Sequence, residues 1–561
     1  MSKLFIAFLI GVLLMTASSN DASAQSETKF YRANPGRPGR SITMSQHGII
    51  ATEHMLASQA GLDMLRSGGS AMDAAIAAAS TLAVVEPMMT GMGGDAWFLY
   101  YEAKTGKVHA LNGSGHSPKA LTREYFDAKS ATSIDDESWE AVTVPGAVDA
   151  WYTGHKRFGK KPWNEVLAPA IRYAEKGFPV YEVLGMVWKL TGPELKKDAA
   201  ASATYLVDGK APAIGSIFKS PKLAQSLRAV AEGGRDAYYK GAIAQEIVRY
   251  AQETGGFLTL DDFAAHASTW VEPVTVNYRG YDVYQCPPNG QGMGVLMMLN
   301  ILEGYDLKSM RYDSPEHLHL MIEAKKLAYA DLYKFVADPE LVKVPVTGLL
   351  SKEYAAKRRK LIDAKHAMPA TDPGIPKDGD TTYLTVIDDE GNACSFINSL
   401  YAAFGSKKVG GETGILLQNR GAGFTLERGH FNEYAPGKRP YHTIIPGMVL
   451  KDGKLYMSYG LMGGDMQPQG HVQFLTNHLD FGYTIQEAVE APRWRHQDGL
   501  NVIVEPGMPE DGVAGLTALG HSVKPSMFLE FGGSQVVLVD PVTGVYFGAS
   551  DPRKDGAALG Y

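Results

Sequence analysis

The stretch that decides the fold is "GDTTYLTVIDDEGNACSFINSLYAAFG", residues 379 to 405. The segments "TYLTVID" and "ACSFINS" alternate apolar and polar residues around the turn "DEGN", which predicts two paired β-strands. The preceding "AMPATDPGIPKDGD" (367 to 380) has three prolines, two glycines and no apolar periodicity, which predicts a loop. Thr381 therefore stands where a loop meets a strand.

The two sides of this loop differ in pattern. Before it, residues 150 to 270 and 296 to 366 are mostly helical in pattern, and residues 54 to 87 predict two helices divided by glycines, the second of them Ala-rich. After it, strand patterns dominate. A mostly helical part followed by a strand-led part predicts an α+β protein with helices layered on stacked sheets. Further strands are expected in "AWFLYYE", "KVHALN", "IIPGMVLKDGKLYMSYG" and "SQVVLVDPVTGVYFGAS".

Composition and charge exclude some classes of protein. The 561 residues, 45% hydrophobic and 20% charged with 61 glycines, are typical of a turn-rich soluble globular protein. A length of this kind allows about two to four domains. The formal net charge of -7 and the lack of a dense Lys/Arg tract argue against a nucleic-acid binder.

The start of the chain predicts export. Lys3 precedes the apolar run "LFIAFLIGVLLM" (4 to 15), and small residues "ASA" (22 to 24) precede Gln25, which is the pattern of a secretory signal peptide over residues 1 to 24. A membrane anchor is the alternative, but no later segment approaches 18 uninterrupted apolar residues. We expect a periplasmic or secreted protein, soluble once the signal is removed.

The two cysteines, Cys286 and Cys394, do not make a disulfide framework in a chain of this size. We expect each to be a small buried hydrophobic residue. Whether they pair stays open.

Thr381 has the chemistry of a possible nucleophile. A threonine hydroxyl is weak and needs a base, and one available base is the residue's own α-amine, whose ordinary pKa is near 8. That requires a cut before Thr381, in which its hydroxyl attacks the carbonyl of Asp380 and water completes the cleavage. Taken alone, a Thr-Thr pair that opens a strand reflects ordinary β-propensity.

Ordered blocks along nearly the whole mature chain favour the interpretation of Thr381 as a nucleophile over ordinary β-propensity. The blocks are "SGGSAMDAAIAAASTLAVVEPMMTGMGGD" (67 to 95), "VPGAVDAW" (144 to 151), "PPNGQGMGVLMMLNILEGYDL" (287 to 307), "TTYLTVIDDEGNACSF", "FGSKKVGGETGILLQN" (404 to 419), "APGKRP" (435 to 440), "MGGD" (462 to 465) and "GASDPRKDGAALGY". With these blocks the sequence resembles the γ-glutamyltranspeptidase family of N-terminal nucleophile hydrolases, and many blocks at family spacing are more specific than one motif.

The resemblance implies a precursor that cuts itself between Asp380 and Thr381. Its products would be a mostly helical large subunit (25 to 380) and a catalytic small subunit (381 to 561), held together as a heterodimer in one αββα fold. The family's second hydroxyl falls on Ser399, which would orient the nucleophile, and its oxyanion-stabilising pair falls on Gly463 and Gly464. A strand-face serine and a tight turn are the plainer interpretations of these residues.

The sequence departs from the family where the γ-glutamyl head group binds. The family's carboxylate-binding Arg is Ser114 here, and the acid that holds the α-amine is Gly423. Arg420 replaces a glutamine and introduces a cation that can bind a carboxylate in two-pronged fashion, or serve as a structural ion-pair partner. The remaining departures are Tyr401 for an asparagine and His442 and Thr443 for a pair of serines. The blocks "NRGAGF", "YHTIIPGMV" and "GLMGGDMQPQGH" are similar to the oxamate amidohydrolase and cephalosporin acylase-like subgroup.

We therefore expect an amidohydrolase or acyltransferase whose substrate is a small amide bearing a carboxylate. Water or an amine would accept the acyl group, and the mechanism needs neither cofactor nor metal. The histidines of "HLH" (317 to 319) and the pair His471 and His478 are expected to be packed or solvated rather than metal ligands. A true glutathione hydrolase and an uncleaved exported binding protein are the alternatives. The acyl group, the acceptor and the oligomeric state beyond the heterodimer stay open.

Overall fold

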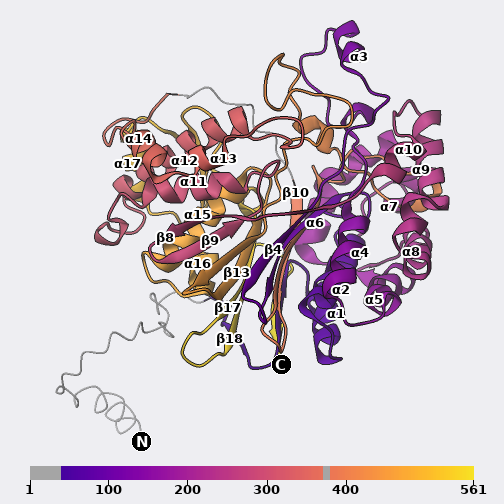
Figure 1. The fold of residues 1–561 in the computed structure, drawn as a ribbon, viewed down its shortest axis with the longest axis horizontal. Coiled ribbons are helices and arrows are strands. Elements are labelled where there is room, and N and C mark those ends of the chain that lie inside the picture. The colour runs from indigo at the N-terminus through magenta and orange to yellow at the C-terminus, as the bar shows by residue number, and fades with distance from the viewer. Residues whose placement is uncertain (1–38, 370–379) are drawn as a thin grey trace, which may run out of the picture.

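Two stacked seven-stranded sheets form the middle of the molecule (Figure 1). This computed structural model describes residues 39–369 and 380–561, so the predicted signal peptide and residues 370 to 379 of the predicted loop lie outside the described residues. In order, the first sheet contains β19 (Ala557–Gly560), β2 (Ile49–Thr52), β10 (Asp380–Ile387), β11 (Ala393–Tyr401), β3 (Asp95–Glu102), β4 (Lys107–Gly113) and β7 (Thr269–Val271). The second contains β1 (Thr43–Ser45), β18 (Tyr546–Ser550), β17 (Gly533–Val539), β13 (Lys454–Met462), β12 (Gly447–Lys451), β9 (Tyr281–Gln285) and β8 (Val274–Tyr278).

Helices lie on both outer sides of this pair of sheets, which gives four layers in the predicted order αββα (Figure 1). On the side of the first sheet are α1 (Met55–Arg66), α2 (Ala71–Val85), α4 (Ala147–Phe158), α5 (Trp163–Lys176), α6 (Glu182–Thr191), α7 (Ala199–Tyr205), α8 (Pro221–Tyr239), α9 (Ala242–Glu253) and α10 (Leu260–Ala265), with α3 (Arg123–Ala128) at the edge. On the other side are α11 (Gly292–Leu302), α12 (Pro315–Phe335), α13 (Val346–Leu349), α14 (Lys352–Arg359), α15 (Met466–Leu479), α16 (Ile485–Glu490) and α17 (Glu510–Ala518).

Small side chains let the first helical layer approach its sheet. Every residue of the Ala-rich helix α2 is buried. Its start is fixed by a reciprocal cap, in which Ser70 Oγ accepts from the Asp73 N–H and Asp73 Oδ2 accepts from the Ser70 N–H. The two helices predicted within residues 54 to 87 are therefore confirmed as α1 and α2.

Contacts between the sheets set β10 alongside β13. Thr385 Oγ1 donates to Ser458 Oγ at 2.6 Å, and both side chains are buried. Two residues before Thr385 and two residues after Ser458, a Cβ on Gly460 would lie 2.4 Å from the Tyr383 ring, so only glycine fits there. These two contacts run toward the start of β10, where Thr381 lies, and toward the end of β13, which Gly463 follows.

The strands predicted on either side of "DEGN" are confirmed as β10 and β11, and those of "AWFLYYE" and "KVHALN" as β3 and β4. The mostly helical first part also supplies strands that were not predicted, because β1, β2 and β7 to β9 are only three to five residues long. Their short runs give little periodic signal.

Two further predictions can be compared with the described residues. Cys286 and Cys394 are both buried and free, as expected of small hydrophobic residues. Within residues 39–369 and 380–561, none of the helices has the length and apolar character needed to cross a membrane.

Candidate active site

A break in strand register places Thr381 at the start of β10. Asp380 is paired with Tyr401 and Thr382 with Asn398, so β11 has one residue more than β10 across this interval. Such a bulge locally redirects side chains. Here Thr381 Oγ1 donates to Ser399 Oγ at 3.2 Å, and both residues are fully buried.

Ser399 Oγ gathers donors around the predicted nucleophile. Besides Thr381, it accepts from the Tyr401 N–H at 2.9 Å and from Arg420 Nη2 at 2.9 Å. Tyr401 has φ +86°, a backbone conformation unusual for a non-glycine residue. Strained backbone of this kind clusters at functional sites. The structure thus brings together Thr381, Ser399, Tyr401 and Arg420.

Arg420 is a fully buried cation beside this pair of hydroxyls. It begins the 3₁₀ turn η5 (Arg420–Gly423), donates from Nη1 to Thr443 Oγ1 at 2.6 Å, and has its Cζ 4.6 Å from the centroid of the Tyr401 ring. Burial lowers the pKa of Arg420 to about 10, and the charge of Asp95 opposes this shift. The guanidinium therefore remains charged at neutral pH, and its Nε has no hydrogen-bond partner among the described residues.

Asp95 and His442 form a buried pair next to Arg420. His442 Nδ1 accepts from the Ile444 N–H at 3.3 Å, which leaves Nε2–H to donate to Asp95 Oδ2 at 3.0 Å. Burial holds the pKa of His442 well below its ordinary value, so the ring is neutral. Burial raises the pKa of Asp95 to about 7, against the charge of Arg420 and hydrogen bonds from Gln418 and two backbone N–H groups.

Gly463 and Gly464 join β13 to helix α15 and have φ values of +122° and +52°. Neither N–H is hydrogen-bonded to another protein group within the described ranges. Two free N–H groups at the N-terminus of a helix suit a developing negative charge. The two glycines follow the end of β13, toward which the contacts between β10 and β13 run from Thr385 and Tyr383.

Gln291 connects the turn at Gly463 and Gly464 (the glycine turn) to the buried hydroxyls of Thr381, Ser399 and Thr443 (the hydroxyl cluster). Its Nε2 donates to the Thr443 carbonyl at 2.5 Å and to the Gly464 carbonyl at 2.9 Å. Since Thr443 also accepts from Arg420, one chain of hydrogen bonds leads from Thr381 to the glycine turn.

Two of the predicted residues stand outside that chain. Ser114 donates from both N–H and Oγ to Asn112 Oδ1, at 2.9 and 2.7 Å, and its neighbour Gly115 donates to Asp95. Gly423 ends η5, where an added Cβ would lie 3.0 Å from the Tyr441 carbonyl. An acidic side chain at position 423 would therefore require the Tyr441 backbone to move.

Sequence reasoning missed Asp95 and Gln291. Asp95 ends the block 67 to 95, and an acidic residue directly before the apolar strand "AWFLYY" was the available signal. Gln291 lies in the glycine-rich "NGQGMG" and carried no signal of its own, because its two acceptors are backbone carbonyls far along the chain.

Comparison with known proteins identifies the family. The model of the family described as gamma-glutamyltranspeptidase matches residues 57–561. The chain is 41% identical to the glutathione hydrolase-like YwrD proenzyme of Bacillus subtilis (strain 168) over 530 residues, which cover 91% of this chain and 98% of that protein. It is 36% identical to the oxamate amidohydrolase proenzyme of Klebsiella pneumoniae over 534 residues, which cover 93% and 100%. The crystal structure of cephalosporin acylase from Bacillus halodurans matches at 42% identity with a TM-score of 0.89, covering 94% and 98%. The chain therefore belongs to the γ-glutamyltranspeptidase family of hydrolase proenzymes.

Proposed function

We propose that the protein cuts its own chain between Asp380 and Thr381 and then hydrolyses a small amide through the newly N-terminal Thr381. The observation that carries this proposal is the buried hydrogen bond from Thr381 Oγ1 to Ser399 Oγ, at 3.2 Å, at the start of β10. The relatives named above as proenzymes support a cut, and with it a heterodimer of residues 25 to 380 and 381 to 561.

In the cut, Thr381 Oγ bonds to the carbonyl carbon of Asp380 while the hydroxyl proton is removed. The C–N peptide bond breaks, and the nitrogen takes up the proton lost by the hydroxyl and leaves as the α-amine of Thr381. Water then hydrolyses the ester, which yields the Asp380 carboxylate and restores the hydroxyl.

The same groups serve the amide substrate. The α-amine of Thr381 takes the proton of its own hydroxyl, and Oγ attacks the amide carbonyl. The N–H groups of Gly463 and Gly464 donate to the oxyanion, the substrate amine leaves with a proton, and water hydrolyses the acyl-enzyme. Ser399 and Arg420 keep the nucleophile oriented.

The substrate class follows from the charges near Thr381. Arg420 is buried and its Nε lacks a partner among the described residues, and a buried unsatisfied donor needs an explanation. A carboxylate on the substrate would supply an acceptor there. Ser114 and Gly423 offer no ionic partners to a γ-glutamyl head group. We therefore favour an oxamate-like acidic amide over glutathione, the second candidate.

The decisive experiment compares substitutions at two adjacent threonines. Thr381→Ala lacks the attacking hydroxyl and should remain a single chain on denaturing electrophoresis. Thr382→Ala is the matched control, because Thr382 is equally buried but donates to the Asn398 carbonyl, and it should give two subunits. Thr381→Ser keeps a hydroxyl and should also be cut. Normal processing of Thr381→Ala would overturn the proposal.

We also propose that the protein is exported to the periplasm or secreted, on the signal-peptide pattern of residues 1 to 24. N-terminal sequencing of the mature large subunit should begin at or near Gln25. A mature protein that still begins at Met1 would contradict export by this route.

A further inference from the structure

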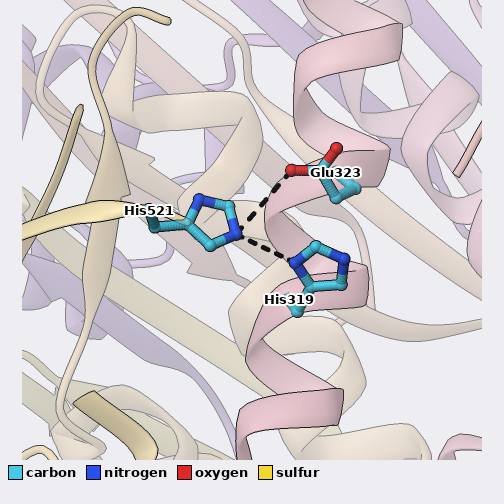
Figure 2. A group of neighbouring side chains, drawn as sticks. All are labelled: His319, Glu323 and His521. Atoms are coloured by element: carbon cyan, nitrogen blue, oxygen red, sulfur yellow. Dashed lines mark hydrogen bonds and ion pairs between the residues drawn. The ribbon is translucent and has the colours of Figure 1, made fainter. Parts of the chain in front are cut away.

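A cluster of three buried side chains lies on the helical side of the second sheet, apart from the hydroxyl cluster. His319 and Glu323 are one turn apart on α12, and His521 directly precedes β16 (Ser522–Pro525) (Figure 2). Their relative exposures are 1%, 0% and 2%. Each offers one ligand atom, and these atoms all lie within 4.8 Å of one another.

We propose that His319, Glu323 and His521 bind one divalent transition-metal ion, with Zn²⁺ as the best fit to two imidazoles and one carboxylate. His319 Nδ1 is 2.9 Å from His521 Nε2, which is 3.7 Å from Glu323 Oε1. A tetrahedral Zn²⁺ with bonds of about 2.0–2.1 Å needs ligand atoms about 3.3 Å apart. The two measured separations bracket that value, and the three protein ligands leave a fourth position for water.

The surroundings fix the first two ligands in a metal-binding orientation. His319 Nε2 lies 2.7 Å from the Asp363 carbonyl, so it carries the proton and leaves the lone pair on Nδ1 facing the cluster. Metal-ligating histidines characteristically donate their other N–H to such an acceptor. Glu323 Oε2 accepts from the Met368 N–H at 3.1 Å, which turns Oε1 toward His521.

Lys326 competes with this ion for the Glu323 carboxylate. Its Nζ is 2.7 Å from Glu323 Oε1 and also donates to the Met368 carbonyl at 2.9 Å. An ammonium at Oε1 repels a second cation, so Lys326 weakens metal binding without occupying either histidine. Lys326→Gln keeps a donor for Met368, and it should therefore tighten metal binding.

The site would join the two sides of the proposed cut. His319 and Glu323 precede Asp380, and His521 follows it, so this consequence rests on the proposed function. A metal bound here would link the large and small subunits through a coordinate bond and hold Asp363 and Met368, which lead toward the cut.

The experiment measures zinc in protein free of any affinity tag. After equilibration with Zn²⁺ and dialysis, mass spectrometry of the metal should find one ion per chain in the wild type and none in His521→Asn or Glu323→Gln. His317→Asn is the matched control, because His317 is buried on the same helix but packs against Tyr312 and Phe481, and it should keep the ion.

Zinc should raise the Tm of the wild type and leave that of His521→Asn unchanged. A wild type that retains no zinc would overturn the proposal and leave a hydrogen-bonded cluster only; equal zinc in His521→Asn and wild type would also overturn it. Glu323→Gln is isosteric and lies in a different element from His521→Asn, and circular dichroism reports whether each variant folds. Thr381→Ala should bind the same amount of zinc, so a failed cut and a failed metal site are distinguishable.

Discussion

Replacing Ser399 by alanine tests whether its hydroxyl prepares Thr381 for attack. Ser399 Oγ accepts from Thr381, from the Tyr401 N–H and from Arg420, so the substitution leaves three buried donors without this acceptor. An unsatisfied buried donor costs about 1–3 kcal/mol, which sets a range of about 3–9 kcal/mol if nothing moves. Arg420 keeps its bond to Thr443, so we expect the free energy of unfolding to fall by about 3 kcal/mol.

The effect of Ser399→Ala on the rate of the proposed cut follows from the loss of one hydrogen bond to Thr381 Oγ1. Losing a hydrogen bond worth about 1–1.5 kcal/mol should slow processing about tenfold. Denaturing electrophoresis of newly made chains gives the rate. Urea unfolding of the Thr381→Ala single chain, with and without Ser399→Ala, gives the part of the stability loss that comes from the Tyr401 N–H and Arg420, because this background lacks the Thr381 hydroxyl. Ser399→Thr keeps the hydroxyl and should process at nearly the wild-type rate. Ser399→Ala chains that are cut as fast as wild type would refute the role assigned to Ser399.

Three other substitutions test the rest of the site. Arg420→Gln removes a charged hydrogen bond worth about 1.5–3 kcal/mol, so KM for oxamate should rise about 10- to 100-fold while KM for neutral oxamide changes little; equal changes would exclude recognition of a carboxylate. Asp95→Asn should flatten the pH dependence of unfolding. Burial raises the pKa of Asp95 to about 7, so Asp95 contributes about 4 kcal/mol to the free energy of unfolding at low pH. This contribution is fully present below about pH 4 and is lost as pH rises through 7. Gly463→Ala forces an L-residue to φ +122° and should lower kcat more than it changes KM, which steady-state kinetics would show; an unchanged kcat would contradict the oxyanion role.

Local periodicity explains why much of the fold was predictable. The strands β10 and β11 and the helices α1 and α2 have patterns long enough to be recognised, with glycines and a turn at their ends. By contrast, β1 and β2 are three and four residues long and gain their stability from partners distant in sequence. Nothing local distinguishes such a segment from a loop.

The site was predictable only as a set of residue positions. Family blocks predicted site roles for Thr381, Ser399 and Arg420, and these roles stay predictions. The blocks did not indicate that Arg420 donates to Ser399, because that contact depends on η5 folding against the end of β11. Asp95 was missed for the same reason. Its role as the charge beside Arg420 arises from tertiary packing, and burial then shifts both pKa values.

The arrangement of strands explains how two pieces could work as one enzyme after a cut before Thr381. In the first sheet, β10 lies between β2 and β11, and β11 pairs in turn with β3. β2 and β3 precede the proposed cut, whereas β11 and all of β10 except Asp380 follow it. Separating the subunits would therefore break the ladder between β2 and β10 and the ladder between β11 and β3. The residues of the candidate site would be divided in the same way, with Asp95 before the proposed cut and Arg420 after it. Cleavage would therefore free the α-amine of Thr381 while the fold that positions its hydroxyl stays assembled, and the subunits should separate only when the sheets unfold.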